Sequence, residues 1–233
     1  MLADEDNLFV VADGMGGHAS GEVASRMAID TLREFFRATS ADPEATWPYK
    51  MDKARGYEEN RLITGIKLAN LRIYEAAQND PQMHSMGTTV AGILVIEDGV
   101  LIAHVGDSRV YRIREGKLEQ LTSDHSLLND YIKMKRLSEE EIESFPLKNV
   151  IVRALGMKST VKVDTFLDRP EIGDIYVLCS DGLCGPVTDE AIHRIVHSQP
   201  DLQTAANRLI EEANDNGGPD NITVVLAKVM GLS

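Results

Sequence analysis

Apolar residues recur along the chain with two periods, which predict a few helices and many short strands. Helical spacing predicts helices at residues 20–36, 62–77, 189–197 and 202–213. Short apolar or alternating runs predict strands at residues 8–12, 87–96, 100–105, 109–114, 117–121, 161–167, 174–180 and 222–229. Residues 39–49 are expected to form a loop, and the charged segment 125–145 is expected to be weakly helical.

Tight turns join the strands in the middle of the chain. Glu97-Asp98-Gly99 and Glu115-Gly116 are hairpin signals. Parallel neighbours need long crossovers, so strands joined this closely are expected to form an antiparallel sheet. Helices at both ends and a strand meander between them predict one α+β layered domain over residues 1–233.

Composition and charge exclude several classes of protein. The 24 Lys and Arg stand against 37 Asp and Glu, a net charge of −13, whereas a nucleic-acid-binding domain needs a basic face. No apolar run approaches the ~20 residues that cross a bilayer, and no signal peptide is visible. The two cysteines do not make a disulfide framework. We therefore expect a cytoplasmic protein with neither nucleic-acid nor membrane partners.

Four aspartates stand at the ends of apolar runs. Asp13, Asp107 and Asp181 each follow a predicted strand, and Asp220 precedes the last one. Carboxylates held at one rim of a sheet repel one another, and a hard divalent cation with oxygen ligands relieves that repulsion. Each aspartate alone is explained as an ordinary turn residue. Their shared position indicates a metal site.

The glycine-rich turn after Asp13 matches two nucleotide-binding patterns imperfectly. Residues 14–19 fit G-x-G-x-x-A, but Asp13 would face the pyrophosphate, and hairpins replace the second βαβ unit. The P-loop pattern fails because Glu22 and Val23 stand where Lys and Ser or Thr are needed. A dinucleotide-binding enzyme is thus a distant alternative.

Six motifs follow one another over residues 8–229: Asp13-Gly-Met-Gly-Gly-His18, Met86-Gly-Thr-Thr-Val-Ala91, His104-Val-Gly-Asp-Ser-Arg109, Arg153-Ala-Leu-Gly156, Cys179-Ser-Asp-Gly-Leu183 and Gly218-Pro-Asp-Asn-Ile-Thr223. In this order they resemble the metal-dependent type 2C protein Ser/Thr phosphatases in their bacterial form. The resemblance implies a four-layer α-β-β-α sandwich of two antiparallel sheets flanked by helices.

The resemblance also implies a centre of two Mn²⁺ or Mg²⁺ ions. Asp13, Asp181 and Asp220 would be ligands with the backbone carbonyl of Gly14, and Asp107 with Asp181 would hold a third ion. The first three aspartates would act catalytically through a metal-bridged water, whose pKa is lowered toward 7. That water would hydrolyse phosphoserine or phosphothreonine in proteins without a phospho-enzyme.

The chain departs from the family at its start. The family opens with a strand that carries a phosphate-contacting arginine and an Asn-Glu-Asp cluster, but only twelve residues precede Asp13. We expect this strand to be missing from residues 1–233, so neither that arginine nor a general acid is assigned, and Glu5 and Asp6 are kept outside the site. The departure leaves a catalytically silent regulatory or binding module as the alternative function.

A flap-like segment is expected at residues 125–150, where the family has a mobile flap beside the site. Its basic residues Lys133, Lys135 and Arg136 would dock an anionic phosphopeptide, with a solvated helix face as the competing interpretation. The expected partners are phosphoprotein substrates, with a Ser/Thr protein kinase and its targets at the family level. A monomer is expected.

Five further residues receive no catalytic role. Cys179 is expected in a buried strand, and no arginine follows it or Cys184 closely enough for a thiol-based phosphatase. His193 and His197 are four apart on a predicted helix, but the H-E-x-x-H glutamate is replaced, which favours a solvated face. His18 stays open between a contact near the substrate and a capping or packing role.

Overall fold

The computed structural model describes residues 2–3, 7–16, 18–42, 46–134, 141–142, 145–147 and 150–231, with the backbone alone at residues 2–3 and 18–19. The strands in this part of the chain are β1 (Leu2–Ala3), β2 (Leu8–Val11), β3 (Gly14–Met15), β4 (Gly87–Thr88), β5 (Val90–Ile96), β6 (Gly99–Val105), β7 (Arg109–Arg114), β8 (Lys117–Gln120), β9 (Asp164–Asp168), β10 (Ile175–Cys179) and β11 (Val224–Lys228). The helices are α1 (His18–Ala41), α2 (Tyr57–Asn79), α3 (Leu127–Lys133), α5 (Asp181–Cys184), α6 (Asp189–Ser198) and α7 (Leu202–Asp215), with a short 3₁₀ helix η2 (Pro81–Met83).

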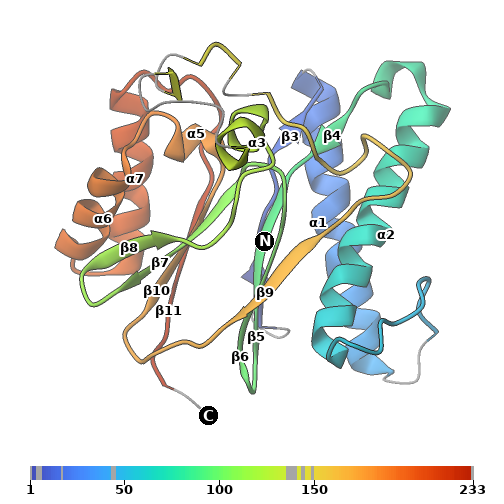
Figure 1. Ribbon diagram of the computed structural model, residues 1–233, viewed down its shortest axis with the longest axis horizontal. Helices are drawn as coiled ribbons and strands as arrows, with labels where there is room; N and C mark the ends of the chain where they lie inside the picture. The colour runs from blue at the N-terminus through green and yellow to red at the C-terminus, as the bar shows by residue number, and fades with distance from the viewer. Residues whose placement is uncertain are drawn as a thin grey trace.

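Two antiparallel sheets stack face to face, and a helix pair covers the outer face of each (Figure 1). The first sheet has the order β1-β2-β5-β6-β9, and the second has the order β11-β10-β7-β8. Helices α1 and α2 pack on the first sheet, and α6 and α7 pack on the second. This arrangement confirms the α+β class and the α-β-β-α sandwich.

The layers follow from the alternation of side chains along each strand. In β5, Val90 and Leu94 face the helices, whereas Ala91 and Ile93 face the second sheet. Both faces of this strand are therefore buried, which explains its continuous apolar sequence. Each large side chain buried in this way contributes about 1.5–3 kcal/mol.

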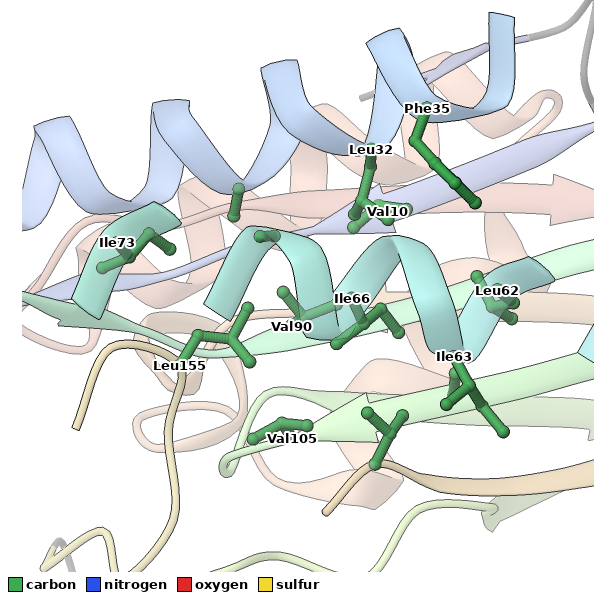
Figure 2. Packing of buried hydrophobic residues seen from close by; sticks show 14 of the residues in the cluster. Val10, Leu32, Phe35, Leu62, Ile63, Ile66, Ile73, Val90, Val105 and Leu155 are labelled. Atoms are coloured by element: carbon green, nitrogen blue, oxygen red, sulfur yellow. The ribbon is translucent and has the colours of Figure 1, made fainter. Parts of the chain in front are cut away.

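Helix α1 reaches the first sheet through its apolar stripe. Figure 2 shows Leu32 and Phe35 of α1 above Val10 of β2, with Ile66 of α2 beside Val90. Gly65 lets the two helices approach, because a Cβ there would lie 3.0 Å from a methyl group of Leu32. The helix pair therefore forms a fixed wall on this side of the molecule.

Both helices are longer than the sequence pattern predicts. Helix α1 continues to Ala41, and Arg61 of α2 contacts its last turns by donating a hydrogen bond to the carbonyl of Phe36 at 2.8 Å. Helix α2 begins at Tyr57, five residues before the predicted start. Its first turn is organised by Asn60, whose amide donates to the carbonyls of Asp52 at 3.0 Å and Gly56 at 2.9 Å.

The predicted strand at residues 87–96 is two strands in the structure. Residues 87–88 form β4, which pairs with β3 in a separate two-stranded sheet, and β5 begins at Val90. Strand β9 begins at Asp164, three residues after the predicted start. Part of the predicted flap-like segment forms α3, which Ser126 caps by accepting a hydrogen bond from the N–H of Asn129 at 3.2 Å.

Candidate metal centre

The four aspartates singled out by the sequence lie where strands of both sheets end. Asp13 separates β2 from β3 and Asp107 separates β6 from β7, while Asp181 follows β10 and Asp220 precedes β11. Burial raises the pKa of Asp13 to about 8, together with a hydrogen bond that protonated Asp13 donates to Asp181 and the charges of Asp181, Asp220 and Asp107. Asp13 is therefore near all three other carboxylates.

Asp13 is fixed by two threonines of the Met86–Ala91 motif. The N–H of Asp13 donates to the hydroxyl of Thr89 at 3.0 Å, and the N–H of Thr89 donates back to the carbonyl of Asp13 at 2.8 Å. The Thr88 hydroxyl donates to that same carbonyl at 2.8 Å. The Thr89 hydroxyl also lies 2.7 Å from the hydroxyl of Ser108, which links Asp13 to the turn that carries Asp107.

Gly14 is held against the first helix, and only glycine fits there. A Cβ on Gly14 would lie 1.9 Å from the carbonyl oxygen of Gly21, and a Cβ on Gly21 would lie 2.6 Å from the carbonyl oxygen of Gly14. These two glycines let β3 pack closely against the first turns of α1. The backbone beside Asp13 is thereby fixed in place.

Ser180 joins the two aspartates of the second sheet. Its N–H donates to the carbonyl of Thr223 at 3.1 Å, and its hydroxyl accepts from the N–H of Thr223 at 3.1 Å. A Cβ on Gly182 would lie 2.2 Å from the carbonyl oxygen of Asn221, so the turns at Asp181 and Asp220 touch. The pairing of β10 with β11 thus brings the two carboxylates to one edge.

The donor set suits hard divalent cations. The Oδ1 atom of Asp181 is buried without a hydrogen-bond partner among the described residues. Burial and the charge of Asp181 raise the pKa of Asp107 to about 6. Neighbouring carboxylates that repel one another, one of them buried and two half-buried, with one buried oxygen unpartnered, are what Mg²⁺ or Mn²⁺ would stabilise. The residues present therefore fit the implied ions.

A second polar cluster, which no pattern in the sequence predicted, lies behind Asp107. The rings of His104 and His125 stack with centroids 4.6 Å apart, and the Nε2 atom of His125 lies 3.0 Å from Oδ2 of Asp164. Arg153 brings Nη1 to 3.1 Å from that oxygen and 2.9 Å from Nε2 of His125. His104 and Arg153 both belong to the six motifs, which was the only signal for them.

Ligand-type atoms of His104, His125 and Asp164 lie within 4.8 Å of one another, but a cation already occupies this cluster. The Arg153 guanidinium and His125 hold the pKa of Asp164 well below its usual range, against the effect of burial. Burial and the charges of His104 and Arg153 lower the pKa of His125 to about 4, although Asp164 opposes them. We therefore interpret the cluster as a structural ion pair with a neutral histidine.

The remaining predicted residues are only partly described. Lys133 is exposed at the end of α3, whereas Lys135 and Arg136 lie outside the described residues, as does the side chain of His18. Cys179 is fully buried, which confirms its core position. The expectation that His193 lies on a solvated helix face is wrong in part. Its Nε2 atom is buried and has no hydrogen-bond partner among the described residues. None of the described helices has the length and apolar content needed to cross a membrane.

Comparisons with known proteins agree with this geometry. A family model described as "Protein phosphatase 2C" matches residues 2–223. The serine/threonine phosphatase stp of Listeria monocytogenes is 36% identical over 229 residues, which cover 97% of this chain and 85% of that protein. The crystal structure of the serine/threonine phosphatase PstP from Mycobacterium tuberculosis has a TM-score of 0.83 and 36% identity, covering 97% of this chain and 89% of that one. A structure of a PstP catalytic domain in complex with two manganese ions has a TM-score of 0.77 and 35% identity, covering 97% and 88%.

Proposed function

The chain belongs to the protein phosphatase 2C family and is a metal-dependent protein serine/threonine phosphatase, and we propose that Asp13, Asp181 and Asp220 hold its metal ions. The observation that carries the assignment is the convergence of four carboxylates at strand ends of both sheets, where burial and neighbouring charge raise the pKa of Asp13 to about 8. Such a cluster is unfavourable without cations. Its position at the junction of both sheets supports a site that the fold builds for ions.

In this proposal each residue has a defined task. Asp13, Asp181 and Asp220 supply carboxylate oxygens, and Gly14 supplies its backbone carbonyl. Asp107 completes a third site together with Asp181. When bound, the ions supply an activated water and offset negative charge on the phosphoryl oxygens.

The protein's own contribution is to hold these groups in place before the substrate arrives. The Thr88 and Thr89 contacts fix Asp13, and Ser180 fixes the turns of Asp181 and Asp220. Fixed carboxylates reorganise little during the reaction, which is how a preorganised site lowers the barrier. Cys179 has no role in the proposed reaction, because it is fully buried in β10.

We propose two ions, Mn²⁺ or Mg²⁺, with a third at Asp107. Oxygen ligands accept either metal, and the related structure in complex with two manganese ions supports a pair. Phosphoproteins are the substrates that the family implies. A Ser/Thr kinase and its targets as partners, a cytoplasmic location and a monomeric state remain proposals.

The experiment compares hydrolysis of a phosphothreonine peptide with and without Mn²⁺ in the 233-residue chain and in Asp181→Asn. Asp98→Asn, in the exposed β5–β6 turn, is the matched control. Metal-dependent turnover that Asp181→Asn abolishes and Asp98→Asn retains supports the assignment. An inactive parent chain that still binds Mn²⁺ would favour the silent regulatory module instead.

A further inference from the structure

Two adjoining cavities, neither of which is lined by any of the four aspartates, form a basic groove beside α2. The larger cavity, about 450 Å³, lies between residues 49–55, α2 and residues 160–163. The smaller, about 240 Å³, is lined by residues 152–162. Thr160, Val161 and Lys162 line both cavities, so they form one continuous depression. We call these residues together the basic groove.

We propose that the basic groove binds an acidic segment of a protein substrate that flanks its phosphorylated residue. The inference rests on the proposed function and adds a substrate preference to it. It differs from the flap docking predicted above, which involves Lys133, Lys135 and Arg136.

The groove is lined mainly by positively charged residues, whereas the molecule as a whole carries a net negative charge. Six basic residues and one acidic residue, Asp52, line it, whereas the whole chain carries −13. The basic residues are Lys50, Arg55, Lys67, Arg153, Lys158 and Lys162. A local cationic surface on an acidic protein steers anionic partners toward itself.

Carboxylates of the chain neutralise only half of these cations. Asp164 pairs with Arg153 at 3.1 Å and with Lys162 at 3.3 Å, and Arg55 pairs with Asp52 and Glu59. Lys50, Lys67 and Lys158 form no ion pair among the described residues. Lys67 is instead placed over the ring of Tyr49, with Nζ 5.9 Å from the ring centroid. These three ammonium groups are therefore available to an acidic ligand.

The walls of the groove are fixed by buried hydrogen bonds. Asn70 of α2, which is 1% exposed, donates to the carbonyl of Lys158 at 3.1 Å and accepts from the N–H of Gly156 at 2.9 Å. Asn60 ties residues 52–56 to the start of the same helix. A ligand would therefore meet a preformed surface and lose little free energy in ordering it.

The groove is continuous in the chain with the metal centre. Leu155 and Thr88 exchange two backbone hydrogen bonds of 2.8 and 3.1 Å, and the Thr88 hydroxyl contacts the carbonyl of Asp13. Arg153 and Lys158 lie on either side of Leu155, and Figure 1 shows the segment before β9 passing across α2. A substrate held at the four aspartates could thus continue along this segment.

The test compares Lys50→Glu/Lys67→Glu/Lys158→Glu with the control Arg37→Glu/Lys117→Glu/Lys228→Glu. Both sets change the charge by the same amount, and the control residues are exposed and lie outside the groove. Each protein is assayed with Mn²⁺ on three substrates. These are a phosphothreonine peptide with acidic flanks, the same peptide with Asn and Gln flanks, and p-nitrophenyl phosphate.

We expect the groove variant to raise KM for the acidic peptide at least fivefold, with kcat unchanged and the other two substrates unaffected. High salt should remove the preference of the parent chain, because exposed charges are screened. Equal KM values for the two triple variants, or no preference in the parent, would overturn the proposal. If the unsubstituted chain did not hydrolyse p-nitrophenyl phosphate with Mn²⁺, that result would instead refute the proposed function. If the charge-reversed groove variant does not fold, Lys50→Gln/Lys67→Gln/Lys158→Gln replaces it, and the same rise of KM for the acidic peptide is expected.

Discussion

His125 and Gly106 hold each other through two hydrogen bonds. The N–H of Gly106 donates to Nδ1 of His125 at 3.0 Å, and the N–H of His125 donates to the carbonyl of Gly106 at 2.9 Å. Because Nδ1 accepts, the ring must be neutral, with its proton on Nε2 toward Asp164. Gly106 immediately precedes Asp107, so a neutral His125 fixes the turn that carries this proposed ligand.

The stability of the protein should fall in acid because of this ring. The pKa of His125 is lowered from 6.5 to about 4, so the unfolded chain takes up the proton first. Its contribution is complete above pH 6.5 and is lost as the pH falls toward 4, by about 3 kcal/mol. The loss linked to Asp164 comes at lower pH, because the pKa of that carboxyl is itself depressed.

Urea unfolding between pH 7 and 4.5 checks this dependence, with His125→Asn as the matched variant. The Asn oxygen can accept from Gly106 but does not titrate. The difference in the free energy of unfolding between parent and variant should therefore change with pH. Parallel pH profiles for the two proteins would contradict the assignment of a neutral His125.

Asp181→Asn should stabilise the metal-free protein while destroying its response to metal. The substitution removes a charge that raises the pKa of Asp13, so repulsion within the cluster falls. We expect an increase of about 1 kcal/mol in the free energy of unfolding in EDTA. Thermal unfolding with EDTA and with Mn²⁺ measures both effects, and Asp98→Asn should keep the full Mn²⁺ stabilisation.

Asp13 should act in the opposite direction to His125 and, in the metal-free protein, contribute a loss of stability as the pH rises from 4 to 8. Native Asp13 keeps its proton up to about pH 8, whereas the unfolded carboxyl releases it near 3.8, so folding binds a proton across this window. Mn²⁺ should remove this dependence. A flat profile in EDTA from pH 5 to 8, after subtraction of the Asp13→Asn profile, would show that Asp13 is not perturbed.

Gly14→Ala should be among the most damaging single-methyl changes in the chain. The added Cβ would lie 1.9 Å from the carbonyl oxygen of Gly21, so β3 or the start of α1 must move. We expect a loss of about 2–4 kcal/mol, together with weaker Mn²⁺ binding in calorimetry. Gly56→Ala is the control, because a Cβ there would meet nothing within 4 Å beyond its chain neighbours, and the φ of −66° is ordinary.

Arg114 and Asp174 form a pair whose loss should affect stability without affecting catalysis. The guanidinium contacts both carboxylate oxygens at 2.6 and 2.9 Å, and the Asp174 side chain is only 1% exposed. Arg114→Met leaves that carboxylate buried without its cation, at a cost of about 3 kcal/mol. Adding Asp174→Asn should recover part of the loss. The pair lies at the other end of β7 from Asp107, so kcat at saturating metal should stay unchanged.

The sequence predicted the parts of this molecule that repeat with a fixed period. The strands and helices followed from apolar periodicity, whereas the two sheets flanked by helix pairs were expected from the family resemblance. The four aspartates were singled out because each adjoins an apolar run. The early start of α2 was missed because polar residues build it: Asn60 bonds to a turn that precedes the helix, and Arg61 bonds to α1. Strand β4 has only two residues, too few for any periodicity.

The cluster behind Asp107 was missed for a related reason. Arg153 and Asp164 reach His125 from positions 28 and 39 residues away. No local pattern predicts a contact of that kind, because the three residues stand in three segments that are far apart in the sequence. Only the pairing of β6 with β9, and of Ser126 with Ile151, brings the three together.

The position of the aspartates on two different sheets has a consequence for how long the molecule survives. Asp13 follows a strand of the first sheet, Asp181 and Asp220 adjoin strands of the second, and Asp107 lies where the chain passes from one sheet to the other. Asp13 and Asp220 are 207 positions apart in the sequence. Ions shared among them would link β2 to the last strand, β11, as a crosslink does. Separation of the sheets would then require release of the ions. We expect resistance to proteolysis, and hence cellular lifetime, to follow the supply of the metal.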